Sequence, residues 1–256
     1  MPRTRRPATL LAARAAPPNP PETQDMPDPK EIAGRRAAEF VAEGMTLGLG
    51  TGSTVHFTLV RIAERIRAGE LARVRGVPTS LDTERKAREW GIPLVSLDDV
   101  TAIDLTIDGA DEIDAEFQMT KGGGGALLRE KVVASISRRE VIVAGEEKVV
   151  ARLGTTFPLP VEIVLFARAT VERALVRLGA IPVLRQRDGK AYVTDNGNAI
   201  LDCRFERGIA DPRALELALA RVPGIVESGL FIDLAHVLVV GKRDGTCDVR
   251  ERPARG

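Results

Sequence analysis

Residues 108–131 read DGADEIDAEFQMTKGGGGALLREK, and this stretch decides how the rest of the chain is interpreted. It contains four acidic residues close together, then a lysine with four successive glycines, and then Glu130. The preceding residues, 102–107, alternate between apolar and polar side chains, which is typical of a β-strand. Asp108 therefore stands where a strand ends, and in open α/β sheets ligands bind at that end of the strands.

A helix is predicted to begin directly after the glycines. Leu128, Val132, Val133 and Ile136 recur at helical spacing. The four glycines, 122–125, therefore open this helix, whose first N–H groups have no partner inside it. Because glycine has no Cβ, these N–H groups can approach an anion or an oxyanion closely.

Glu130 is the residue of this stretch with the clearest chemical meaning. Its neighbours three and four residues away on the helix are apolar or small, and no basic residue stands there to pair with it. A carboxylate on such a face is expected to be partly desolvated, which raises its pKa toward the range of a general base. The alternative is a glutamate that extends into solvent at the edge of the helix.

A second glycine-rich turn lies upstream, in the sequence GLGTGST at residues 48–54. It follows a predicted strand at residues 45–49 and precedes an amphipathic helix. Backbone N–H groups at the start of a helix, with the hydroxyls of Thr51, Ser53 and Thr54, are suited to a phosphate. The dinucleotide-binding motif is excluded because it has glycine in place of Ser53, and no Walker loop occurs. A tight turn without a ligand is the alternative.

Strands and helices alternate through the first half of the chain. Further strands are predicted at residues 92–97 and 139–144, and a helix at residues 30–43. The sequence PTSLDT at residues 78–83 begins another helix, and Lys148 follows the last of these strands. Polar and glycine-rich residues thus occur repeatedly at one edge of the sheet. This pattern predicts an α/β fold with a Rossmann-like, mostly parallel sheet.

From Phe157 the pattern changes to that of a second, smaller α+β domain. Antiparallel hairpins are predicted at the turns Asp188-Gly189 and Asn196-Gly197. The strands and helices of this part are expected at residues 160–166, 169–178, 181–187, 192–194, 200–203 and 212–220. Residues 229–240 are expected to supply two strands that return to the first sheet.

The predicted domains are therefore a Rossmann-like catalytic domain, residues 30–156 and 228–250, and a smaller α+β domain, residues 157–227. Residues 1–29 are rich in Arg and Pro and have no periodicity, so we predict a disordered extension. A start at Met26 would explain the same composition. A transit peptide is the other alternative, although the segment is poor in serine.

Composition argues against several classes of function. A net charge of +1 gives no electrostatic reason to expect nucleic acid or an anionic membrane as a partner. No apolar run is long enough to cross a bilayer. Cys203 and Cys247 have no metal-ligand spacing, so we expect free thiols in a reducing compartment, the cytoplasm. His56 and His236 are both expected to be structural.

Taken together, the motifs resemble those of ribose-5-phosphate isomerases of type A. They are GLGTGST, PTSLDT, DGADEID, KGGGGALLREK, FPLPVEI and TDNGNAILD, and the resemblance extends from about Lys30 to about Gly245. It implies a Rossmann-like catalytic domain, a smaller α+β domain and a homo-oligomer, a homodimer or homotetramer. It also implies interconversion of D-ribose 5-phosphate and D-ribulose 5-phosphate, without metal or other cofactor, in the non-oxidative pentose phosphate pathway.

The resemblance further implies a role for each site residue. Glu130 is expected to move the proton between C1 and C2, and Asp108 and Asp111 to handle ring opening and hydroxyl protons. Lys121 and the glycines after it are expected to stabilise the enediolate, while Lys148, Lys30 and the 51–54 loop bind the phosphate. The substrate-binding residues that the resemblance implies are Lys30, Thr51, Gly52, Ser53, Thr54, Asp108, Gly109, Ala110, Asp111, Lys121, Gly122, Gly123, Gly124 and Lys148.

Elementary chemistry agrees with these roles. Isomerisation through an enediol needs one base, one or two proton carriers, and a cation or amide cluster for the oxyanion. Glu130, the pair Asp108 and Asp111, and Lys121 with the glycine N–H groups supply them. One departure from the family is the sequence Glu146-Glu147 before Lys148, where a smaller polar residue is frequent.

Three alternatives stay open. The acidic loop could hold Mg²⁺ or Ca²⁺, but the EF-hand pattern fails and no histidine is near. A coenzyme A transferase would use Glu130 as a nucleophile instead of a base. A non-catalytic sugar-phosphate sensor would need the phosphate loop but not Glu130, and would usually carry a DNA-binding module as well.

Overall fold

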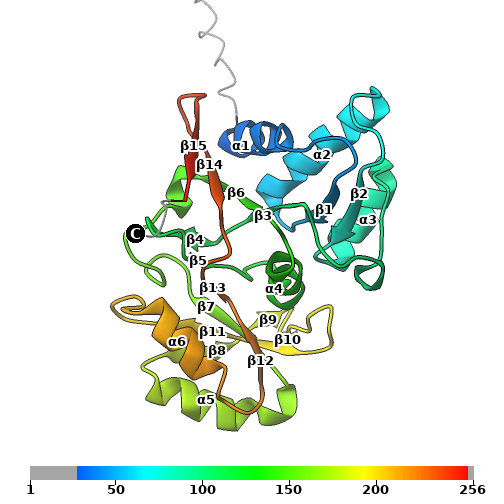
Figure 1. Ribbon diagram of the computed structural model, residues 1–256. Helices are drawn as coiled ribbons and strands as arrows, with labels where there is room; N and C mark the ends of the chain where they lie inside the picture. The colour runs from blue at the N-terminus through cyan, green and yellow to red at the C-terminus, as the bar shows by residue number, and fades with distance from the viewer. Residues whose placement is uncertain (1–27, 253–256) are drawn as a thin grey trace, which may run out of the picture.

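The computed structural model describes residues 28–252, and its centre is a six-stranded sheet (Figure 1). Five strands are parallel in the order β14-β6-β3-β1-β2, and β15 pairs antiparallel with β14 at the edge. The expected Rossmann-like α/β class is thus confirmed. The strands of this sheet are β1 (Thr46–Leu49), β2 (Arg75–Pro78), β3 (Leu105–Gly109), β6 (Glu140–Gly145), β14 (Val237–Gly241) and β15 (Cys247–Glu251).

Helices cover both faces of this sheet. In β6, Val141 and Val143 pack into the core on the side of α2, whereas Ile142 packs with Ala134 of α4 on the opposite side. α1 packs against α2 on the first side (Figure 1). The helices of the described chain are α1 (Pro29–Ala38), α2 (Ser53–Arg67), α3 (Leu81–Trp90), α4 (Leu127–Ser135), α5 (Arg168–Arg177) and α6 (Pro212–Leu219).

The helix predicted at residues 30–43 is shorter in the structure. α1 begins after Asp28, whose side chain accepts the N–H of Lys30, and it ends at Ala38. The N–H groups of Phe40 and Val41 then donate to carbonyls only three residues back, which tightens the chain into turns. This path directs Val41 into the core, and burial of that side chain outweighs one more helical turn.

The strand predicted at residues 92–97 is absent from the described sheets. Only Leu94 forms a bridge, to Gly76 of β2, and a short 3₁₀ helix, η1 (Leu97–Asp99), follows. Pro93 has no N–H group to donate to a neighbouring strand, and the Ser96 side chain caps η1, so pairing stops here.

Antiparallel sheets form the remainder of the fold. A four-stranded sheet in the order β12-β7-β11-β8 carries α5 and α6 and has its own apolar core, while β9 pairs with β10 and β13-β5-β4 form a third sheet. This arrangement supports the two-domain division, whose boundaries stay a prediction. The strands are β4 (Glu112–Ile113), β5 (Met119–Thr120), β7 (Leu159–Ile163), β8 (Ile181–Leu184), β9 (Gln186–Arg187), β10 (Lys190–Ala191), β11 (Ala199–Arg204), β12 (Ile225–Ser228) and β13 (Leu230–Phe231); η2 (Glu146–Lys148) and η3 (Leu165–Ala167) are 3₁₀ helices.

Two strand predictions in this part are wrong. Residues 192–194 form no strand, because the loop they begin is built around the buried carboxylate of Glu162. The Thr194 hydroxyl and the Asn196 and Asn198 side-chain amides all donate to its Oε1. Of the two strands expected within residues 229–240, only β14 joins the parallel sheet, while β13 pairs with β5.

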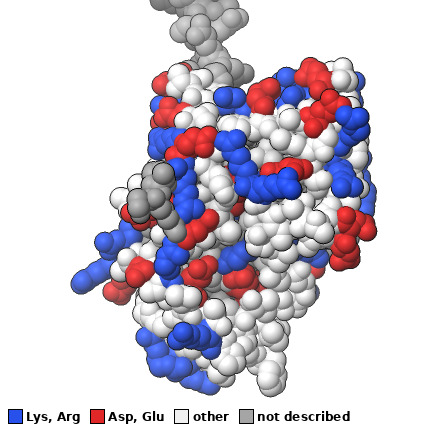
Figure 2. Space-filling view, in the orientation of Figure 1, with Lys and Arg blue, Asp and Glu red and all other residues white. Residues whose placement is uncertain are grey.

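The remaining composition-based expectations concern thiols, histidines and charge. Cys203 and Cys247 are free thiols. His236 accepts the Glu140 N–H through Nδ1, and His56 packs edge-on against Trp90, so both histidines make structural contacts. Across residues 28–252 no helix combines the length and apolar character required to span a membrane. In the upper part and along the left side of the face in Figure 2, acidic and basic side chains are interspersed. The predicted extension at residues 1–29 lies almost wholly outside the described residues.

Candidate active site

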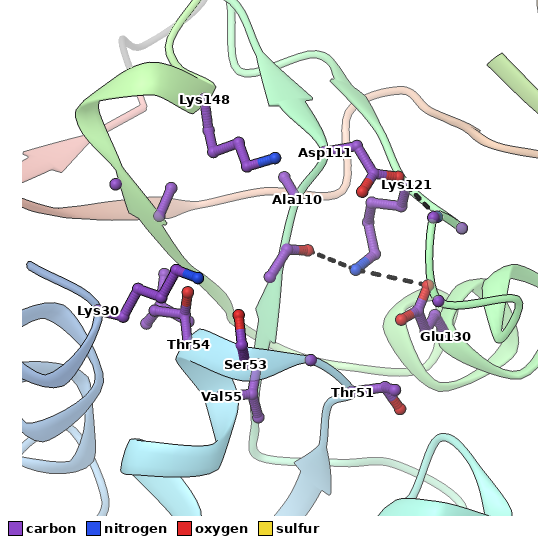
Figure 3. A pocket seen from close by; sticks show the side chains of 18 of the residues that line it. Lys30, Thr51, Ser53, Thr54, Val55, Ala110, Asp111, Lys121, Glu130 and Lys148 are labelled. Atoms are coloured by element: carbon purple, nitrogen blue, oxygen red, sulfur yellow. Dashed lines mark hydrogen bonds and ion pairs between the residues drawn. The ribbon is translucent and has the colours of Figure 1, made fainter. Parts of the chain in front are cut away.

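A cavity of about 280 Å³ opens at the carboxyl ends of β1, β3 and β6 (Figure 3). It brings together nearly every residue that the sequence selected, although these lie up to 118 positions apart in the chain, from residue 30 to residue 148. Asp108 is the exception, since it is fully buried beneath the cavity. The selected residues that line the cavity are Lys30, Thr51, Gly52, Ser53, Thr54, Gly109, Ala110, Asp111, Lys121, Gly122, Gly123, Gly124, Glu130 and Lys148.

Lys121 is the centre of a buried charge cluster at one end of the cavity. Its Nζ lies 3.0 Å from Oδ2 of Asp108 and 3.6 Å from Oε2 of Glu130, and it donates a hydrogen bond to the Gly109 carbonyl. Burial alone would lower the pKa of Lys121, but attraction to Asp108, Glu130 and Glu140 raises it above its ordinary value. The ammonium therefore stays charged and fixed beside Glu130.

Glu130 lies inside the protein, with 5% of its surface exposed, so the alternative of a solvent-extended side chain is wrong. Its Oε2 accepts no hydrogen bond from any described residue. Burial raises its pKa to about 8; the Lys121 ammonium opposes this shift, and the Asp108 and Asp111 carboxylates add to it. A carboxyl group with this pKa can both accept and return a proton near neutral pH.

Asp108 and Asp111 occupy different positions in the site. Oδ1 of Asp108 accepts the N–H groups of Thr51 and Gly109, at 3.0 and 2.8 Å. Residue 50 must be glycine for this contact, because a Cβ there would come within 2.3 Å of that oxygen. Asp111 reaches the cavity, and burial raises its pKa despite the 2.7 Å hydrogen bond from Gly123.

The glycine-rich loop connects β5 to α4. Gly122 has φ of +103°, a conformation that side chains rarely adopt, and the loop closes with a hydrogen bond from Gly125 to the Gly122 carbonyl. α4 begins without a side-chain cap. Gly122–Gly124 line the cavity together with Asp111 and Glu130. The Gly123 N–H donates to Asp111, whereas the Gly124 N–H donates to no described residue and is available to an oxyanion.

The opposite end of the cavity is suited to an anion. Lys30 extends into it next to Ser53 and Thr54, and Lys148 extends into it from η2, on the side of Ala110 (Figure 3). Neither lysine lies within ion-pair distance of a carboxylate in the part of the chain that the structure describes. Gly52, with φ of +130°, precedes α2 and provides no side-chain cap, so the first N–H groups of α2 can receive a ligand.

One predicted contribution to the phosphate loop is wrong. The Thr51 hydroxyl does not serve the cavity, because it forms hydrogen bonds with Thr79, Ser80 and Thr83, at 2.8–3.1 Å. Thr51 thus ties the glycine turn to the start of α3, while Ser53 and Thr54 keep their places at the cavity.

The sequence analysis also missed part of the lining. Residues 143–145 at the end of β6 and Glu147 in η2 line the cavity. The first three lie at the end of a strand, where ligands bind in such sheets, just before Lys148. Glu147 adds a carboxylate to the lining directly before Lys148, where the sequence departs from the family pattern.

The acidic loop was considered as a metal site. Of its four acids, Asp108 and Asp111 belong to the charge cluster, whereas Glu112 faces residues 154–157 and Asp114 closes a local turn. Within residues 28–252, no three His, Cys, Asp or Glu side chains are grouped as metal ligands would be.

Comparisons with known proteins identify the family of this chain. The family model of ribose 5-phosphate isomerase A (phosphoriboisomerase A) matches residues 75–245. Ribose-5-phosphate isomerase A of Bacillus mycoides is 46% identical over 84% of this chain and 96% of its own, and that of Thermosynechococcus vestitus is 48% identical over 87% and 95%.

Solved structures give the same result. Ribose 5-phosphate isomerase from Plasmodium falciparum is 39% identical with a TM-score of 0.86, covering 88% of this chain and 99% of that one. A D-ribose-5-phosphate isomerase in complex with phospho-erythronic acid is 37% identical with a TM-score of 0.85, covering 88% and 98%. The chain therefore belongs to the ribose 5-phosphate isomerase A family and is an isomerase of ribose 5-phosphate.

Proposed function

We propose that Glu130 is the general base of this isomerisation and that the reaction passes through an enediolate. The observation that carries the proposal is the buried Glu130 carboxyl, with a pKa raised to about 8 and Oε2 left 3.6 Å from the Lys121 ammonium. A base in this state can take a proton from carbon, exchange it in part with solvent, and return a proton to carbon.

The proton transfers balance as follows. In the open-chain aldose, Glu130 removes the proton from C2, and the electron pair forms the C1=C2 bond and leaves negative charge on O1. The hydroxyl proton of O2 moves to O1 through Asp111, which lines the cavity near Glu130. Glu130 then gives its proton to C1, and O2 becomes the carbonyl oxygen of the ketose.

Asp108 takes a different part from the one expected. Because it is fully buried and paired with Lys121 at 3.0 Å, we assign it to holding that ammonium in place, and ring opening to Asp111. Lys121 and the N–H groups of the glycine loop then stabilise the enediolate electrostatically. In this scheme the positive charge at the reacting end comes from Lys121, and no metal or other cofactor is required.

The phosphate is proposed to bind at the other end of the cavity. Lys148, Lys30 and the start of α2 with Ser53 and Thr54 can together surround a dianion. Phospho-erythronic acid, bound by the homologous isomerase, joins a planar carboxylate and a phosphate in one molecule. We expect it to bind here too, with its carboxylate toward Lys121 and its phosphate toward Lys148.

The substitution Glu130→Gln tests the proposal, because it keeps the size of the side chain but removes the base. We expect kcat to fall by roughly 10²–10⁴ and KM to change little, since the phosphate contacts remain. Glu116→Gln, an exposed position on the same stretch, is the matched control and should keep full activity. Turnover in D₂O should place some deuterium on C1 of the ketose. Near-native turnover by Glu130→Gln would disprove the assignment.

Assembly and cellular setting also belong to the proposal. Phe166 is 99% exposed, and Val164 and Leu165 beside it are about half exposed, so this apolar patch supports a homodimer or homotetramer. Sedimentation of the wild type against Phe166→Ser tests it. We further propose that the enzyme acts in the cytoplasm, in the non-oxidative pentose phosphate pathway, as its free thiols and substrate suggest.

A further inference from the structure

The glycine loop is held from outside the catalytic cavity by Arg185. This residue follows β8 of the four-stranded antiparallel sheet and lies more than 60 residues from the loop in sequence. Its Nη1 donates to the carbonyl oxygens of Gly122 and Gly123, at 2.9 and 3.1 Å. Two successive peptide groups of the loop are therefore fixed by one guanidinium.

The rest of the guanidinium is also engaged. Nε and Nη2 of Arg185 donate to the two carboxylate oxygens of Asp202 on β11, and the two side chains are only 13% and 24% exposed. This two-bond contact sets the plane of the guanidinium, so Nη1 cannot turn away from the loop. The Tyr192 hydroxyl adds a third contact, 3.3 Å from the Gly124 carbonyl.

Peptide geometry converts these contacts into an orientation of N–H groups. In a planar trans peptide, the N–H group points away from the carbonyl of the residue before it. With the Gly122 carbonyl held by Arg185, the N–H of Gly123 points the other way, and it donates to Asp111 at 2.7 Å. With the Gly123 carbonyl held as well, the N–H of Gly124 is turned to that same side.

The N–H of Gly124 is the donor left for the substrate. It donates to no acceptor within the described residues, and Gly124 lines the cavity. If the peptide before it turned over, the Gly123 carbonyl would face the cavity and repel an oxyanion instead of stabilising it. Arg185 prevents this because the turned peptide would lose the hydrogen bond at 3.1 Å.

We propose that Arg185 is a positioning residue for the isomerisation: it orients the N–H groups of Gly123 and Gly124, and so completes the oxyanion site from the antiparallel sheet. This inference rests on the proposed enediolate mechanism. It concerns contacts that strengthen as charge develops, so loss of Arg185 should lower kcat more than it weakens substrate binding.

The test compares Arg185→Met and Arg185→Lys with Arg187→Met. Arg187 is the matched control, because it stacks on Tyr192 at 4.8 Å but donates to no carbonyl of the glycine loop within residues 28–252. For each variant we would measure kcat and KM for ribose 5-phosphate, the inhibition constants of phospho-erythronic acid and inorganic phosphate, and the thermal midpoint.

We expect Arg185→Met to lower kcat by about tenfold or more and to raise the inhibition constant of phospho-erythronic acid by a similar factor. KM and the inhibition constant of inorganic phosphate should change little. Arg185→Lys should recover part of this loss, since an ammonium can reach one carbonyl. Arg187→Met should behave as wild type. Asp202→Asn, which keeps Arg185 but weakens its anchor, provides a milder variant if Arg185→Met does not fold.

Two results would overturn the proposal. One is that kcat and the affinity for phospho-erythronic acid are unchanged in a folded Arg185→Met or Asp202→Asn variant. The other is that the affinities for phospho-erythronic acid and inorganic phosphate fall by the same factor. Failure here is distinguishable from failure of the proposed mechanism, because Glu130→Gln tests the latter on its own. An inactive Glu130→Gln with a fully active Arg185→Met would refute only the role of Arg185.

Discussion

Two buried glutamates near opposite ends of residues 108–131 have opposite surroundings. Glu112 is fully buried, and its two oxygens accept five hydrogen bonds, from the Gly154, Thr156 and Phe157 N–H groups and the Thr120 and Thr156 hydroxyls. Glu130 is almost as deeply buried, yet its Oε2 accepts none from the described residues.

This difference shows how burial leads to two different uses of one side chain. Donors around Glu112 replace the water that its charge has lost, so the carboxylate holds the 154–157 loop to β4. The missing donors at Glu130 leave the charged form costly, which raises its pKa to about 8, as the proposed role of general base requires. Because the two glutamates are buried to nearly the same extent, the difference between them comes from the number of hydrogen bonds that each carboxylate accepts.

The largest effect that we expect from this comparison is on stability, in Glu112→Ala. Removing the carboxylate leaves several buried N–H groups without an acceptor, which should cost about 3–5 kcal/mol of unfolding free energy. Urea denaturation would measure it. Glu130→Gln should show the reverse signature, with activity lost and stability kept. A Glu112→Ala protein as stable as wild type would break the comparison.

Glu140 at the start of β6 sharpens the comparison, because it is fully buried and neither of its oxygens has a hydrogen-bond partner within the described residues. Burial raises its pKa to about 8 from an ordinary value of 4.5; Lys121 opposes the shift and Asp108 adds to it. The folded protein therefore keeps this proton up to about pH 8, whereas the unfolded chain releases it near pH 4.5.

The unfolding free energy should consequently fall as pH rises between these two values, because the native state binds the additional proton. At about 1.4 kcal/mol per pKa unit, the loss is on the order of a few kcal/mol. Glu140→Met removes this pH-dependent loss of unfolding free energy, so the variant should be more stable than wild type by an amount that grows from about pH 5 to about pH 8. Denaturation curves at both pH values test this, and a constant difference would contradict it.

Lys121 and Lys148, at the two ends of the cavity, also differ in whether their charge has a partner. Lys121 is paired with buried carboxylates, whereas Lys148 has no such partner in the described chain and is free for phosphate. Lys148→Ala should raise KM for ribose 5-phosphate by about tenfold to about a hundredfold, because a charge-assisted contact contributes roughly 1.5–3 kcal/mol. Lys190→Ala, at an exposed position of β10, is the control. An equal loss of activity on unphosphorylated ribose would remove Lys148 from the phosphate site.

The last effect is a pH dependence of activity. A base whose pKa is about 8 must lose its proton before it can act, so kcat/KM should rise roughly tenfold per pH unit below that value and level off above it. Rates at several pH values above about 6.5 avoid the ionisation of the substrate phosphate. Lys148→Ala should keep the same midpoint. A flat profile would mean that Glu130 is already ionised.

Local sequence patterns predicted many of the strands and helices. The spacing of apolar residues predicted β1, β3, β6 and the helices that follow them, because each element must bury its apolar side chains whatever its neighbours are. The predictions that failed depended on distant partners. Residues 192–194 bend around Glu162, and residues 230–231 pair with β5, and neither partner is visible in the segment itself.

The site divides in the same way. The sequence by itself determined the chemical groups, since the acidic loop, Lys121, the four glycines and Glu130 stand in one continuous stretch, with the phosphate loop upstream. The tertiary structure alone decided which acid has hydrogen-bond partners and which lacks them, that the Thr51 hydroxyl turns away, and that Arg185 contacts the glycine carbonyls. The physical reason is that reactivity depends on hydrogen-bond partners and water exclusion, and these come from residues far along the chain.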